Sequence, residues 1–150
     1  LRSYKTETRQ HLIDSIKRIV KAQAESAGMP ADKMPEVIVS DDQTPALYNQ
    51  PALCGEVRRH LESALGAANV LTREPVMGAE DFAEYGLTKE KVPLCMFWLG
   101  TQPPAVVAEA KKKGTTLPSL HSPYFKPIPE PSIETGVKSL TSAVIGLMNK

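Results

Sequence analysis

The sequence of 150 residues predicts an α/β fold in two pieces. Short segments rich in β-branched or apolar residues, such as 36–40 and 94–99, alternate with longer stretches whose apolar residues recur at helical spacing. Segment 94–99 is apolar throughout, which is typical of a strand covered on both faces of an α/β sheet. The polar connection at 41–51 contains two prolines, so we expect a domain boundary there, dividing 1–46 from 47–150.

The first piece reads as strand, helix and strand. Residues 1–4 resemble the end of a strand, and Thr6 is a plausible N-cap for a long helix with an apolar stripe. Gly28 is placed to end that helix, and residues 36–40 suit a second strand. This order predicts half of a split β-α-β lobe.

The second piece begins with a helix from Pro51 to the stop at Gly66, capped by Asn49 or Gln50. A strand at 69–72, a short helix at 78–85 and the strand at 94–99 are expected to follow.

Residues 102–119 hold three prolines and a small Ala/Lys-rich helix, which indicates a surface insertion. The last helix is expected from Ser132, with an inward stripe at Ile133, Val137, Leu140, Val144 and Leu147.

Composition excludes several classes of protein. Hydrophobic residues make up 41% and charged residues 23%, as in ordinary globular proteins, and the net charge of +1 argues against nucleic-acid or membrane partners. Cys54 and Cys95 are far apart in sequence and are interpreted as core residues or thiols, not as a disulfide framework. The sequence begins without methionine inside a predicted strand, so we expect a fragment whose targeting signal cannot be assessed.

Two segments carry candidate chemistry. His121 lies in the polar turn Leu120-His121-Ser122-Pro123, where a neutral imidazole can reach a metal, although a lone loop histidine is more often solvated. Gly78 precedes the acidic pair Glu80 and Asp81, which suit either the dipole at a helix start or the wall of a pocket. His11 and His60 are interpreted as surface residues, so the sequence does not assemble a complete metal site.

The chain resembles the C-terminal part of the metal-dependent amidohydrolases of the aminoacylase/carboxypeptidase metallopeptidase superfamily, which includes hippurate hydrolase. Two segments, in this order, carry the resemblance: Met77-Gly78-Ala79-Glu80-Asp81-Phe82 and Leu120-His121-Ser122-Pro123. The resemblance implies the C-terminal half of a ferredoxin-like lid lobe at 1–46. It also implies the C-terminal part of a zinc-exopeptidase-like α/β catalytic domain at 47–150.

The resemblance also implies roles for particular residues. His121 would ligate one or two divalent ions (Zn, Mn, Co or Ni), while Gly78, Glu80 and Asp81 would line the cleft. Arg2, at the end of a lid strand, would hold a substrate carboxylate in its guanidinium fork. The general base and the other ligands of that family lie in motifs absent from these 150 residues, so the chain alone is expected to be inactive.

The expected activity is hydrolysis of N-acyl amino acids. The protein is expected to be a soluble homodimer formed through the lid, and a cytoplasmic location is favoured over a periplasmic or exported one. A dipeptidase or exopeptidase of the same superfamily would share these motifs. A non-catalytic, truncated or degenerate domain would keep the fold without the chemistry. For Arg2, the alternative that it is an exposed strand arginine with no role in binding is as well supported as a contact with a substrate carboxylate.

Overall fold

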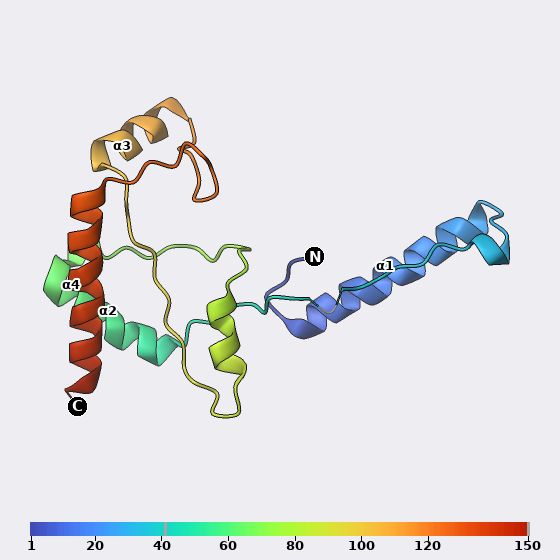
Figure 1. The fold of residues 1–150 in the computed structure, drawn as a ribbon, viewed down its shortest axis with the longest axis horizontal. Helices are drawn as coiled ribbons and strands as arrows, with labels where there is room; N and C mark the ends of the chain where they lie inside the picture. The colour runs from blue at the N-terminus through green and yellow to red at the C-terminus, as the bar shows by residue number, and fades with distance from the viewer. Residues whose placement is uncertain (41, 150) are drawn as a thin grey trace. The chain divides into compact units, whose positions relative to one another are not determined.

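Helices supply the regular structure of the described residues, 1–40 and 42–149, in this computed structural model (Figure 1). The elements in chain order are α1 (Thr6–Ser26), η1 (Ala31–Lys33), α2 (Pro51–Leu65), η2 (Ala67–Asn69), η3 (Asp81–Leu87), α3 (Pro104–Lys113) and α4 (Pro129–Met148), where η marks a 3₁₀ helix. The chain divides into two units: Leu1–Asn49 with Arg73–Leu94 form unit 1, and Gln50–Thr72 with Cys95–Lys150 form unit 2.

The predicted α/β fold is wrong, and with it the ferredoxin-like lobe and the zinc-exopeptidase-like domain. Among the described residues none of the expected segments 1–4, 36–40, 69–72 and 94–99 forms a strand. Local β preference is not sufficient, because a strand exists only where a neighbouring segment supplies ladder hydrogen bonds. The described pairing of this kind is an isolated parallel bridge between Asn49 and Leu94.

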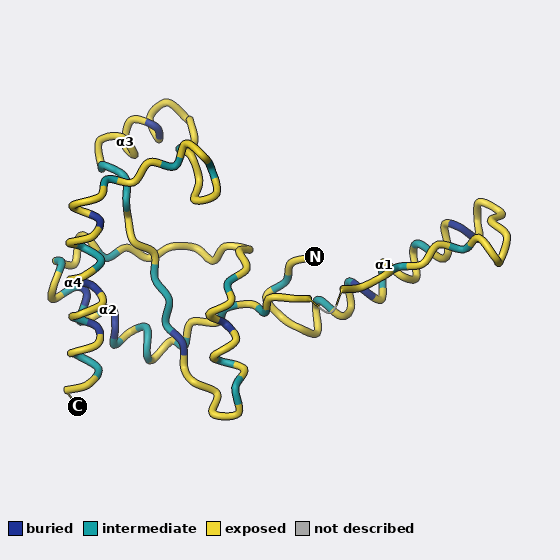
Figure 2. Tube along the Cα trace, viewed as in Figure 1, coloured by how far each residue is buried: buried dark blue, intermediate teal, exposed yellow. Residues whose placement is uncertain are grey.

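Helix α1 of unit 1 confirms the expected long helix. Its N-cap is Lys5, and the predicted cap Thr6 is its first residue. Gly28 has a φ of +68°, in the left-handed region that favours glycine, and the backbone N–H groups of Gly28 and Met29 donate to carbonyls of the last turn. Most of α1 is exposed, with Ile13 and Ala24 buried (Figure 2).

The core of unit 2 lies where α2 packs against α4. Val57, Leu61 and Ala143 are buried there, and the partly buried residues packed against them are Leu53, Val70, Cys95, Phe97 and Leu147. The Ser142 hydroxyl donates to the His60 carbonyl oxygen at 3.0 Å, which ties the two helices together. Gln50 caps α2, since its side-chain oxygen accepts from the Leu53 N–H, which settles the choice between Asn49 and Gln50.

Helix α4 begins three residues earlier than expected and presents a different face. Ile133, Val137, Leu140 and Val144 of the predicted inward stripe are 52–66% exposed, while Ser132, Ser139 and Ala143 are buried. Leu147, the fifth residue of the predicted stripe, does pack on the α2–α4 core. Ser132 and Ser139 can be buried because each hydroxyl donates to the backbone carbonyl oxygen four residues earlier. Although α4 is long, the described helices include none with the length and apolar content to cross a bilayer.

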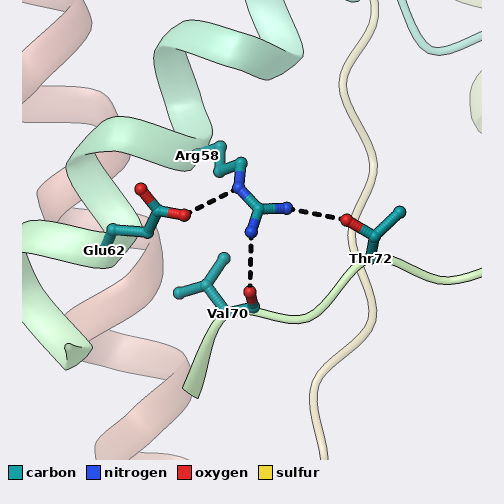
Figure 3. A network of polar contacts seen from close by, with 4 residues as sticks. All are labelled: Arg58, Glu62, Val70 and Thr72. Atoms are coloured by element: carbon teal, nitrogen blue, oxygen red, sulfur yellow. Dashed lines mark hydrogen bonds and ion pairs between the residues drawn. The ribbon is translucent and has the colours of Figure 1, made fainter. Parts of the chain in front are cut away.

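Arg58 of α2 fixes the segment that follows the helix (Figure 3). Its Nε pairs with Glu62 at 2.7 Å, Nη1 donates to the Thr72 hydroxyl at 2.9 Å, and Nη2 donates to the Val70 carbonyl oxygen at 3.0 Å. One planar guanidinium therefore joins Glu62 of α2 to the segment 70–72 that follows the helix.

Candidate functional site

Unit 1 contains four of the five predicted site residues, and a hydrogen bond joins two of the segments that hold them. The Arg2 Nη1 donates to the carbonyl oxygen of Met77 at 2.8 Å, across 75 positions of sequence. Met77 directly precedes Gly78, so the guanidinium lies beside the segment with the acidic pair. This bond uses one of five guanidinium N–H donors, and Arg2 is exposed, which leaves its charge in contact with solvent.

Glu80 and Asp81 stand at the start of η3. The Glu80 carboxylate accepts from the backbone N–H of Phe82 at 3.3 Å and so caps the helix. Asp81 accepts from the Thr44 hydroxyl at 3.4 Å. Glu80 thus caps the start of η3, in line with the helix-start interpretation, whereas Asp81 is bound to a residue 37 positions earlier in the sequence. Thr44 was not anticipated, because a threonine in a polar connection carries no distinctive sequence signal.

Gly78 is exposed, and its backbone does not itself demand glycine. Its φ lies outside the left-handed region, and an added Cβ would meet only the Val76 side chain, at an ordinary 3.8 Å. Its role as a pocket wall therefore depends on a ligand and stays a prediction.

His121 belongs to unit 2, where it is exposed in the turn after residue 119. The turn is held by Ser122, whose N–H donates to the Ser119 carbonyl oxygen at 3.0 Å and whose hydroxyl accepts from the Tyr124 N–H at 3.2 Å. An imidazole on such a turn is accessible to an ion from solvent. The described residues include no group of three or more His, Cys, Asp or Glu arranged for a metal, so they do not fit a complete metal centre.

The other two histidines differ from each other. His11 is exposed, as expected. His60 is half-buried, because its ring lies against Gly146 of α4, so the interpretation of His60 as a plain surface residue is wrong.

The comparisons connect the chain with carboxypeptidases. No family model matches it, and no solved structure matches it. Thermostable carboxypeptidase 1 and thermostable carboxypeptidase 2 of Saccharolobus solfataricus are each 32% identical to it over 125 residues, which is 83% of this chain and 27% of each relative. The chain thus spans about a quarter of the length of the curated relatives it matches. The similarity supports a peptidase superfamily and not the narrower hippurate hydrolase type.

Proposed function

We propose that this chain contributes to a metal-dependent hydrolase that cleaves an amide bond next to a free carboxylate. The observation that carries the proposal is the hydrogen bond from Arg2 to Met77, which sets an exposed guanidinium beside the Gly78–Asp81 segment. Similarity to two carboxypeptidases supports the class of reaction.

The substrate chemistry follows from the guanidinium. A planar fork with several N–H donors binds a carboxylate through two parallel hydrogen bonds, and such charge-assisted bonds are stronger than neutral ones. Glu80 and Asp81 would then limit where the carboxylate enters, because like charges repel it from their side of the segment. N-acyl amino acids of the hippurate kind present this carboxylate, and they are our first candidate substrate.

A peptide with a free C-terminus is the second candidate, favoured by the names of the two relatives. It presents the same carboxylate, so Arg2 serves either substrate, and dipeptides fall in the same class. Assaying the full-length protein that carries this sequence with hippurate and with N-blocked peptides separates the two. If neither hippurate nor the peptides are hydrolysed with any divalent ion tested, the result would instead support a non-catalytic domain.

Arg2→Ala tests the carboxylate contact in that full-length protein. We expect kcat/KM to fall roughly ten- to 150-fold on a substrate with a free carboxylate, which corresponds to a loss of about 1.5–3 kcal/mol in transition-state stabilisation. The corresponding carboxamide should be hydrolysed nearly as well by variant and wild type. Arg18→Ala is the matched control, since Arg18 is an exposed arginine of the same unit. An equal loss on both substrates would make Arg2 a structural residue.

We further propose His121 as one ligand of a site for one or two divalent ions, Zn, Mn, Co or Ni, completed by groups outside the described residues. His121→Ala should lower the bound metal of the full-length protein by about one equivalent, with the fold retained because an exposed turn contributes little packing. Elemental analysis measures this, with His11→Ala as the control. Unchanged metal content would remove His121 from the site.

A homodimer formed through residues 1–46, with 47–150 as a separate domain, also stays a proposal. Sedimentation equilibrium of the chain with and without residues 1–46 tests it, since loss of the segment should then yield monomers.

A further inference from the structure

The two cysteines of the chain, separated by 40 residues in sequence, meet within unit 2. Cys54 lies on α2, three positions before Val57 and seven before Leu61. Residues at this spacing share one face of a helix. Cys95 packs against the buried cluster that contains those same two residues. Helical register and packing therefore bring both side chains to the same side of α2.

The two thiols also interact directly, since a side-chain hydrogen bond joins Cys95 to Cys54. Both side chains are half-buried, which leaves them within reach of a small reagent. Burial, and then the hydrogen bond and charge of Cys54, raise the pKa of Cys95 to about 12. The raised pKa keeps the Cys95 thiol protonated near neutral pH, so the first attack on an external disulfide falls to Cys54 and the slower second attack to Cys95, which must lose its proton to attack.

We propose that Cys54 and Cys95 form a reversible disulfide within unit 2 by exchange with a low-molecular-weight disulfide such as oxidised glutathione. The Cys54 sulfur attacks one glutathione sulfur, breaking its S–S bond and releasing one reduced glutathione. The Cys95 sulfur then attacks the mixed disulfide, forms the Cys54–Cys95 bond and releases the second reduced glutathione. Two protein thiols are oxidised, one glutathione disulfide is reduced to two thiols, and the two protons pass to the released glutathiones.

The bond would fasten the segment that starts at Cys95 to α2. Cys95 and Phe97 already pack on the α2–α4 core without forming a strand with any described segment. A disulfide would hold the segment by a covalent bond instead of by the ladder hydrogen bonds of a sheet. It would also close a large ring, which constrains the unfolded chain more than a small ring does. Oxidation would thus stabilise unit 2.

Equilibration of the purified chain in glutathione redox buffers tests the proposal. Peptide mapping without reduction should find a Cys54–Cys95 peptide in monomeric protein, lighter than its two reduced parts by two hydrogen atoms. Folding that holds the thiols in contact should raise the equilibrium constant for the disulfide at least about tenfold over the value in concentrated urea, or about 1.4 kcal/mol.

The single variants Cys54→Ser and Cys95→Ser are matched controls. Cys95→Ser should accumulate the mixed disulfide at Cys54, because the second thiol is missing. An equilibrium constant equal to or below that of the urea-unfolded chain would overturn the proposal, and so would disulfide-linked dimers in place of the monomeric bond. The test involves neither metal nor hydrolysis, so its outcome is independent of the proposed function.

Discussion

Arg58→Ala removes three contacts of unit 2 at once, and its cost follows from their exposure. The Arg58 and Glu62 side chains are 42% and 30% exposed, so their ion pair contributes only about 0.3–0.5 kcal/mol. The hydrogen bonds to Thr72 and Val70 contribute about 0.5–1.5 kcal/mol each, the Thr72 bond at the lower end because it is exposed. We expect a total loss of about 1.5–3 kcal/mol in the free energy of unfolding.

Urea unfolding followed by far-ultraviolet circular dichroism measures this loss. Arg59→Ala is the matched control, because Arg59 is the exposed neighbour on the same helix, and it should change stability by less than about 0.5 kcal/mol. Arg58→Lys keeps the charge without the planar fork, so it should fall between Arg58→Ala and wild type. Equal stabilities of Arg58→Ala and Arg59→Ala would refute the view that the guanidinium holds Val70 and Thr72.

Three further predictions concern packing, ionisation and capping. An added Cβ at Gly146 would collide with the His60 ring, so Gly146→Ala should lower the free energy of unfolding by about 1–3 kcal/mol. His60→Ala should remove the collision and restore part of that loss. Gly55→Ala of α2 is the control: its added Cβ meets open space, so it should stabilise by about 0.5–1 kcal/mol in the same thermal unfolding measurement. The folded pKa of Cys95, about 12, lies above the ordinary thiol value of 9.0, so the unfolded state loses its proton first and stability should fall as pH rises from 9 towards 12. Cys95→Ser should flatten that part of the pH–stability curve under reducing conditions. Glu80→Ala removes the cap of η3 and should cost about 0.5–1 kcal/mol, while Glu80→Gln, which keeps a side-chain oxygen, should cost less in the same assay.

Helix positions were predictable from the sequence, because their signals are local. The apolar period and the glycine stops placed α1 and α2 within a residue or two, since both depend on neighbours along the chain. Strands were not predictable in this way. Segment 94–99 has a strand's composition, yet pairing depends on a distant partner that composition does not reveal.

The face of α4 shows a second limit of sequence patterns. A stripe of large apolar residues predicts the buried side, but α4 meets α2 through Ser142, Ala143 and Gly146, and Ile133 and Val137 are exposed. Periodicity finds an amphipathic helix without indicating which neighbour is close enough to require small residues.

Residues of the candidate site could be proposed from the sequence, but their contacts could not. Gly78, Glu80 and Asp81 were marked by their order in the sequence, and the bond from Arg2 to Met77 supplies the spatial link that no local signal contains. The contact of Cys54 with Cys95 was likewise hidden, because thiols far apart in a chain carry no pairing information until the fold is known.

The discontinuous make-up of unit 2 has a consequence for the order in which a ribosome makes the chain. Helix α2 (Pro51–Leu65) is synthesised long before α4 (Pro129–Met148), the helix it packs against. Until α4 emerges, Val57 and Leu61 lack the Ala143 surface that helps to bury them, and nascent apolar surface of this kind is a target for chaperones and proteases. Arg58 needs only Glu62, Val70 and Thr72, all available early, so its contacts can hold α2 and its following turn in place while the last helix is still being made.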